Sequence, residues 1–304
     1  MPNIETLIPD IQRFLKENDG TGWFTGDVAE TYAKEVTLQL ERAFGTRKGV
    51  PRLRLSQMGP KCPCHLWHSI HSPLLAEPLQ PSAVVKFTFG HQIEAMAITW
   101  ARACGHEVTG EQDELTLDGI SGHRDCIIDG CLVDVKSTST LSFLKFKDKL
   151  LDKVDPNGRP YDGFGYLDQL DGYLAASIDD PLLRVKDRGY ILAIDKQLGH
   201  MCLYEHTYRP DHIRERIAAY KAIVALDRPP SCTCETVPDG QSGNIKLGVT
   251  ASYSPFKYIC FPNLRTFLYS DGPRYLTRVV RRPQRRDGSF ITEVDKHGKV
   301  VYNN

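Results

Sequence analysis

Apolar residues recur at helical spacing in four stretches of the chain. In the first, residues 27–44, the apolar positions lie three or four apart and a glycine follows: Val28, Tyr32, Val36, Leu40 and Gly45. The other three stretches are residues 87–103, 166–176 and 211–226. Because this spacing gathers apolar side chains on one face of a helix, each stretch is predicted to be helical.

Short β-branched and apolar runs between these helices predict strands. Residues 108–117 are strand-like, residues 124–136 predict a hairpin, and residues 189–195 with 200–204 predict a second one. Helices flanking a few strands predict an α/β fold, with a small mixed β-sheet flanked by helices and a helical N-terminal layer.

The pattern also suggests three parts of the chain. Residues 1–80 are predicted to form the helical N-terminal layer, and residues 81–228 the α/β core. After Pro229-Pro230 the composition shifts to glycine, serine, cysteine and proline, so residues 229–304 are predicted to be a C-terminal appendage with a basic tail.

The hairpin within residues 124–136 carries the strongest local signal. Asp129-Gly130 favours a two-residue type I′ turn, because both positions of that turn need positive φ. Such a turn fixes the strand register and gives the following pairs: Ile128–Cys131, Ile127–Leu132, Cys126–Val133 and Asp125–Asp134.

In this register two aspartates, Asp125 and Asp134, face each other on a hairpin whose faces are otherwise apolar. Lys136 lies two residues further along the strand, on the same face. Like charges directly opposite each other destabilise a sheet, so the pair is expected to hold a cation. The neighbouring ammonium suggests chemistry on an anionic substrate.

Composition narrows the class of protein. The 304 residues are 41% hydrophobic and 25% charged, as in an ordinary globular protein. No apolar run approaches the roughly 20 residues of a membrane helix, and no secretory signal is visible. Nine cysteines, an odd number, favour a reducing cytoplasm. The net charge is zero, so binding to nucleic acid would depend on local basic patches.

Further polar residues are predicted to join the aspartates. Glu94 borders the apolar stripe of the helix at 87–103 and can offer a third carboxylate. Gln169 and Tyr173 lie one turn apart on a helix and share a face. Oxygen ligands of this kind suit Mg²⁺ or Mn²⁺, and Mg²⁺ sites commonly include substrate phosphate oxygens. Each residue taken alone is as well explained as helix or strand surface; their order along the chain favours a site.

Four segments in this order resemble the PD-(D/E)XK nuclease superfamily, in its RecB-type branch: Gly90-His-Gln-Ile-Glu94, Gly122-His-Arg-Asp125, Asp134-Val-Lys136 and Gln169-Leu-Asp-Gly-Tyr173. The resemblance covers residues 55 to 285 and implies a restriction-endonuclease-like core in residues 81–228. It departs from the family where Asp134 replaces the commoner glutamate before the lysine.

The resemblance also implies a role for each residue. Glu94, Asp125 and Asp134 would bind the metal, and the carbonyl of Val135 would add a ligand. Lys136 would be the catalytic lysine. On the DNA side, the site would be lined by Gln169 and Tyr173.

Phage-encoded exonucleases are the most similar members, so the resemblance implies a Mg²⁺- or Mn²⁺-dependent DNA exonuclease. It would process DNA ends in replication, recombination or repair, in the host cytoplasm and with phage recombination or replication proteins as partners. Two alternatives stay open: a structure-specific endonuclease, and a catalytically silent protein that binds DNA ends.

Many nucleases of this branch hold an iron–sulfur cluster with one early cysteine and three late ones. At the late positions this chain has Ala251 and Ser254 before Cys260, which argues against a cluster. The remaining cysteines could regroup around zinc or be free buried thiols, and the Cys-x-Cys spacing favours free thiols. The candidate zinc ligands are Cys62, Cys64, Cys232, Cys234 and Cys260.

Three basic stretches are candidate contacts to a nucleic-acid backbone: residues 47–54, 145–153 and 274–286. A solvated charged surface explains each equally well. Nothing resembles a base-reading helix, so binding is expected to be independent of sequence. Four aromatic residues could stack on unpaired bases, although core packing is favoured for most of them: Phe143, Phe146, Phe164 and Tyr166.

Overall fold

The computed structural model describes residues 2–45 and 50–301, without the side chains of residues 42 and 43. The chain divides into two compact units. Unit 1 comprises residues 1–59 and 79–217, and unit 2 comprises residues 60–78 and 218–304. Because Arg47 and Lys48 of the first basic stretch lie outside the described residues, that prediction stays open.

Unit 1 is built on a mixed sheet in the order β1-β4-β5-β6-β7, and this confirms the predicted α/β fold class. β5 and β6 pair in parallel, and the other neighbours are antiparallel. The strands are β1 (Val108–Thr109), β4 (Cys126–Ile128), β5 (Cys131–Thr138), β6 (Arg188–Asp195) and β7 (Met201–Thr207).

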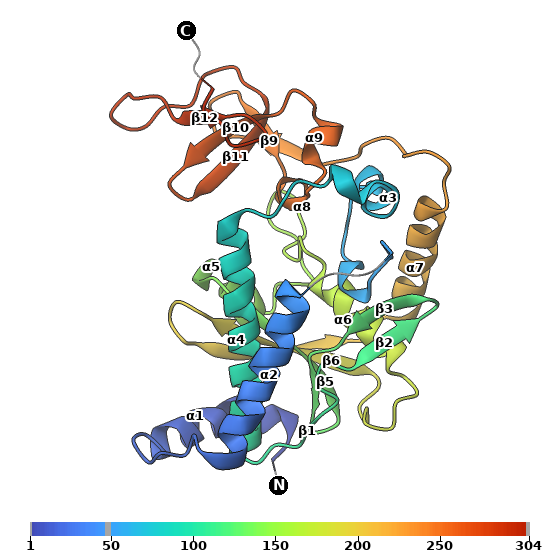
Figure 1. Ribbon diagram of the computed structural model, residues 1–304, viewed down its shortest axis with the longest axis vertical. Helices are drawn as coiled ribbons and strands as arrows, with labels where there is room; N and C mark the ends of the chain where they lie inside the picture. Colours follow the sequence, from blue (N-terminus) through green and yellow to red (C-terminus); the bar gives the residue numbers. More distant parts are fainter. Residues whose placement is uncertain (1, 46–49, 302–304) are drawn as a thin grey trace. The chain divides into compact units, whose positions relative to one another are not determined.

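Helices cover this sheet, and the four predicted stretches are all helical. α4 packs against β5, and α2 and α4 lie side by side (Figure 1). The buried core between helices and sheet includes Ile98, Val133 and Leu192. The helical elements are η1 (Ile4–Thr6), α1 (Leu7–Glu17), α2 (Gly26–Phe44), η2 (Leu55–Gln57), α4 (Pro81–Ala103), α5 (Thr140–Lys147), α6 (Tyr166–Ala176) and α7 (Pro210–Val224).

Two sequence expectations for unit 1 were wrong in detail. The predicted strand at residues 108–117 is two strands, because Gly110 and Gln112 adopt positive φ and turn the chain between them. Its second half, β2 (Glu114–Leu117), pairs with β3 (Ile120–His123) in a separate hairpin. In the apolar stretch at residues 87–103, which was predicted to gather its apolar side chains on one face of a helix, Phe89 is 51% exposed.

Unit 2 contains an antiparallel sheet in the order β12-β10-β11-β9-β8, which the sequence did not predict. Part of the supposed basic tail forms β11. The strands are β8 (Thr236–Pro238), β9 (Ile245–Leu247), β10 (Arg265–Tyr269), β11 (Gly272–Arg278) and β12 (Thr292–Val294). The helices are α3 (Pro63–His71), η3 (Pro73–Leu75), α8 (Val249–Tyr253) and α9 (Lys257–Cys260).

Among the described helices, none combines the length and the apolar character needed to cross a bilayer.

Candidate functional site

The β4–β5 hairpin has the predicted turn and register. Asp129 and Gly130 adopt φ values of 51° and 79°, as a type I′ turn requires. Three of the four predicted pairs are present, Ile128–Cys131, Ile127–Leu132 and Cys126–Val133, and the ladder ends before the fourth, Asp125–Asp134. The buried His106 fixes the turn, with its Nδ1 2.6 Å from an Asp129 carboxylate oxygen. The local sequence signal therefore sets where the strand ends lie.

Asp125 and Asp134 follow the last pair of this ladder. Asp125 Oδ2 accepts the backbone N–H of Val135 at 2.7 Å, so this carboxylate leans over β5. An extended residue directs its N–H and C=O to the same side of the strand, so the Val135 carbonyl faces Asp125 as well. Asp134 is only 2% exposed and lies between two partners: Lys136 Nζ at 2.6 Å from Oδ2, and Gln169 Nε2 at 3.2 Å from Oδ1.

Glu94 supplies the third carboxylate from α4 and is buried. Its Oε1 accepts hydrogen bonds from Gln112 Nε2 at 2.6 Å and from Gln39 Nε2 at 3.1 Å. Two amides therefore orient the carboxylate without neutralising its charge. Asp125, Lys136 and Asp134 act electrostatically on the carboxyl group of Glu94.

Helix α6 brings Gln169 and Tyr173 to the same place. Asp162 caps its N-terminus and accepts the backbone N–H groups of residues 165, 166 and 167, each at 2.9 Å. Tyr173 is buried and hydrogen-bonds Gln169. Gly122 permits this packing, since a Cβ there would lie 2.9 Å from the Tyr173 ring. The structure thus brings all six predicted side chains together in unit 1.

The opposite face of α6 is fixed by ion pairs that the sequence did not reveal. The fully buried Asp171 accepts His206 Nε2 at 2.8 Å and Arg209 Nε at 2.8 Å. One turn earlier, Asp168 contacts Arg209, His212 and Arg216. These contacts hold α6 in position and so hold Gln169 beside Asp134.

The electrostatics of the site reflect an excess of buried carboxylates. Burial, and then the nearby Asp134, raise the pKa of Asp125 to about 7. Burial and Asp125 raise the pKa of Glu94 well above its usual value. For Lys136, burial lowers the pKa, but Asp134 and Asp125 outweigh it and the net shift is upward. The lysine is therefore a charged partner, and one ammonium does not balance three carboxyl groups.

The donor chemistry fits a hard divalent ion. Carboxylate oxygens and a carbonyl are the ligands of Mg²⁺ and Mn²⁺, and a dication would relieve the repulsion that raises these pKa values. Among the described residues, however, the groups whose ligand atoms all lie within 4.8 Å of one another do not include this acidic set. Asp125 and Asp134 are instead engaged with the Val135 N–H and the Lys136 ammonium.

Two members of the site escaped sequence reasoning. Gln39 lies seven positions after Tyr32 and three after Val36, on the apolar stripe of α2, and is 2% exposed. The sequence did contain a sign of this role, because Gln39 is a polar residue on an otherwise apolar stripe. Gln112 lies in a turn, and no pattern in the sequence links it to Glu94.

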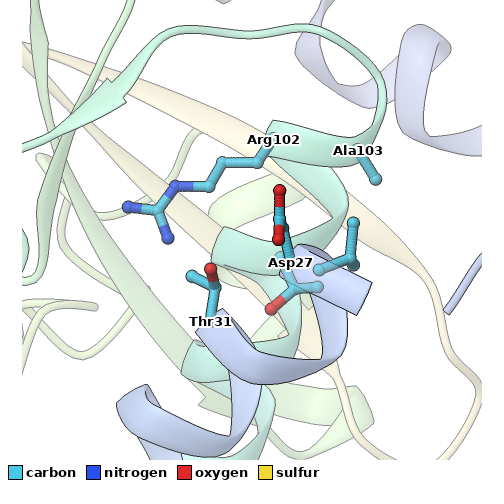
Figure 2. Close-up of a pocket in the computed structure, with 6 residues that line it drawn as sticks. Asp27, Thr31, Arg102 and Ala103 are labelled. Carbon is cyan, nitrogen blue, oxygen red and sulfur yellow. The ribbon is translucent and has the colours of Figure 1, made fainter. Parts of the chain in front are cut away.

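A pocket between α2 and α4 lies apart from this chemistry (Figure 2). It is lined by Asp27, Val28, Thr31, Thr99, Arg102 and Ala103. Arg102 forms an ion pair with Glu111. None of the predicted site residues lines this pocket.

The aromatic candidates divide into two kinds. Phe143 and Phe146 are buried in the core of unit 1. Phe164 is 46% exposed and lies beside Tyr166, with ring centroids 5.9 Å apart. The Tyr166 ring in turn lies 5.6 Å from Lys136 Nζ. Two aromatic rings are therefore next to the acidic set.

Some of the basic candidates have partners, and others are exposed. Arg52 contacts Glu114 at 3.2 Å, and Lys145 donates to the Tyr161 carbonyl at 3.1 Å. Arg274 is paired with Asp239 and Asp271. In the second stretch, Lys147, Lys149 and Lys153 are exposed.

No family model matches this chain, and no curated protein does. Among solved structures, the crystal structure of SSO0001 is 14% identical, with a TM-score of 0.40, covering 77% of this chain and 96% of its own. An alkaline exonuclease, LHK-Exo from Laribacter hongkongensis, is 16% identical, with a TM-score of 0.40 and coverage of 61% and 91%. The same exonuclease in complex with dAMP is 15% identical, with a TM-score of 0.38 and coverage of 58% and 87%. These likenesses are distant, and the function is inferred below from the geometry of the site.

Proposed function

We propose that the chain is a metal-dependent deoxyribonuclease that hydrolyses phosphodiester bonds at DNA ends. One observation carries the proposal: three carboxyl groups, a lysine and a glutamine from four separate segments converge in unit 1. Burial, and then repulsion by the neighbouring carboxylates, raise the pKa values of Glu94 and Asp125. Strained, buried polar groups of this kind occur mainly at functional sites.

The ligands would be the carboxylates of Glu94, Asp125 and Asp134 with the carbonyl of Val135. A bound Mg²⁺ or Mn²⁺ ion would polarise the scissile phosphate and acidify a water molecule.

The side chains around the carboxylates orient the reactants. Lys136 holds Asp134 through its ammonium and places a positive charge where negative charge develops on the phosphate. Gln169 fixes the other oxygen of Asp134 and Tyr173 supports Gln169, so the carboxylate keeps one orientation. Gln39 and Gln112 do the same for Glu94.

DNA is the proposed substrate because the site combines groups suited to phosphate chemistry with a pair of aromatic rings, the exposed Phe164 and the half-buried Tyr166. Phe164 and Tyr166 can stack on an unpaired base while the phosphate lies beside Lys136. A DNA end with frayed bases offers both an unpaired base and a phosphate group. The absence of a base-reading element among the motifs of the sequence favours contacts that do not depend on base identity. We further propose a phage origin and a role in DNA recombination or repair, on the resemblance of the motifs.

The direct test uses end-labelled DNA with Mg²⁺ or Mn²⁺ and a chelator control. We expect release of labelled nucleotides that stops with EDTA and in Asp125→Ala, Asp134→Ala and Lys136→Ala. Unchanged cleavage in any of these variants, with the protein folded, would falsify the assignment.

A circular duplex separates exonuclease from endonuclease. Resistance of the circle, with digestion of the same DNA after linearisation, supports end processing. Nicking of the circle would instead identify a structure-specific endonuclease. Binding of DNA ends without any cleavage would identify a silent end-binding protein.

A further inference from the structure

Unit 2 gathers cysteine and histidine side chains that the nuclease proposal does not use. Within its described residues, the ligand atoms of Cys62, His65, Cys234 and Cys260 all lie within 4.8 Å of one another. Three segments supply them. Cys62 and His65 begin α3, Cys234 precedes β8, and Cys260 ends α9.

The distances match a single tetrahedral ion. A zinc ion with Zn–S near 2.3 Å and Zn–N near 2.0 Å places two sulfurs about 3.8 Å apart, and a sulfur and a nitrogen about 3.5 Å apart. Cys234 Sγ lies 3.7 Å from Cys260 Sγ and 3.4 Å from His65 Nε2. These two distances between ligand atoms are therefore the lengths expected for a tetrahedron around zinc.

The surroundings favour a thiolate at Cys62. This residue is the N-cap of α3, where the helix dipole favours negative charge. The backbone N–H of Thr233 also points at its sulfur, at 3.4 Å. His65 is 6% exposed and packs beside Phe256, so its ring is held in place.

An iron–sulfur cluster fits these residues poorly. The two positions that would supply further thiolates are Ala251 and Ser254, and Ala251 packs in an apolar cluster with Leu247 and Leu264. A cubane cluster also spreads its thiolates over several iron atoms, further apart than the ligands of one ion. Three thiolates and one imidazole around a single ion form a known structural zinc set.

We propose that unit 2 holds a structural Zn²⁺ ion bound by Cys62, His65, Cys234 and Cys260. The ion links α3 to the segments before β8 and at the end of α9. Among the described residues of unit 2, two apolar clusters contain three buried residues each, and small cores are commonly reinforced by a metal.

Cys260 cannot bind the ion while it forms a disulfide bond. In the structure it forms a disulfide with Cys232, while Cys64 lies near both. A thiol reductant supplies the two electrons and two protons that convert this disulfide into two thiols. Cys260 then loses its proton on binding the ion, and Cys232 remains a free thiol. The zinc site therefore belongs to the reduced protein.

Each Cys-x-Cys pair provides a ligand and a matched control. We would purify the full chain and its serine variants with a thiol reductant and without added metal, and measure zinc and iron by mass spectrometry. About one zinc per chain is expected in the wild type, Cys64→Ser and Cys232→Ser. Most of the zinc should be lost in Cys62→Ser and Cys234→Ser. Loss from the control variants but not from the ligand variants would overturn the set, and so would bound iron with sulfide.

Two measurements on the wild type remain decisive if ligand variants fail to fold. Titration with Cd²⁺ should give the intense ultraviolet absorption of thiolate ligands, saturating at one ion per chain. Alkylation after denaturation should modify all nine cysteines in the zinc form, whereas a Cys232–Cys260 disulfide protects two of them. A zinc-free chain with seven reactive thiols would refute the proposal. Asp134→Asn should keep its zinc, so failure of the nuclease assignment leaves this test intact.

Discussion

The two units gather different kinds of side chains that could bind a metal ion. Unit 1 assembles oxygen ligands that repel one another, held by amides, a lysine and the ion pairs behind α6. Unit 2 assembles sulfur and nitrogen ligands at distances suited to one ion, in a part with small apolar clusters. The scaffold of unit 1 tolerates an unfavourable cluster, whereas the fold of unit 2 would gain from its cluster.

The comparison predicts opposite responses to metal removal. A strong chelator should stop cleavage without unfolding unit 1, but should unfold unit 2, because a structural zinc contributes on the order of 10 kcal/mol at neutral pH. Hydrogen exchange followed by peptide should show loss of protection in residues 60–78 and 218–304, and unchanged protection in residues 79–217. Equal loss of protection in both units would contradict the proposed difference between them.

A second prediction concerns Lys136. Lys136→Met removes the charge beside Asp134 and should lower the cleavage rate by about 10²- to 10³-fold, the scale for one electrostatic group. Single-turnover digestion of end-labelled DNA measures the effect. Lys34→Met is the matched control, since Lys34 is exposed on α2 and lies outside the three basic stretches, and it should change the rate less than about twofold. The zinc content should be the same in both variants.

The ion pairs behind α6 give a third prediction. Asp171→Asn keeps one acceptor oxygen but removes the fully buried negative charge beside Arg209, which keeps its contact with Asp168, and should destabilise the protein by about 3 kcal/mol. Denaturant unfolding measures this, and Asp211→Asn, on an exposed pair, should lie within about 0.5 kcal/mol of wild type. If the two variants unfold alike, α6 does not depend on this network.

The smallest effect on stability should come from replacing Glu94, and the sign of that effect is informative. Burial raises the pKa of Glu94, so the folded protein keeps a proton that the unfolded chain releases, and stability falls as pH rises above about 4.5. Glu94→Gln keeps the acceptor oxygen for Gln39 and Gln112 and removes this loss. In EDTA, the variant should melt about 2–4 °C higher at pH 7.5, corresponding to about 1 kcal/mol, with the gap closing near pH 4.5.

The same substitution should abolish cleavage if Glu94 binds the metal. A variant that is more stable than wild type but inactive is expected when the replaced residue serves the reaction and not the fold. A variant that is less stable than wild type at neutral pH would mean that Glu94 supports the fold of unit 1.

Sequence reasoning succeeded where the signal was local. The Asp129-Gly130 turn set the register of the β4–β5 pair, and helical spacing located α2 and α6. These features depend on neighbours within a few residues, so periodicity and turn chemistry were sufficient.

Such patterns do not show which residues far apart in the sequence contact each other in the fold. Gln112 reaches Glu94 and Asp171 reaches Arg209 through the fold, without any repeating spacing. The sheet of unit 2 was missed because β8, β9 and β12 have only three residues each and β11 begins with Gly272-Pro273, which leaves little of the alternation that marks a strand. His65 had a readable signal in its spacing from Cys62, but zinc ligands were sought only among cysteines.

The parallel pairing of β5 with β6 has a consequence for how the protein folds. Val133 pairs with Tyr190, so this contact waits for the whole crossover that contains α5 and α6. The β4–β5 hairpin can close early because its contacts are local, whereas contacts between distant segments form slowly. During synthesis, a chain that ends near residue 150 holds the aspartates but lacks Gln169 and the neighbouring strand. Assembly of the acidic cluster with Gln169 is thus tied to a late and slow closure of the sheet.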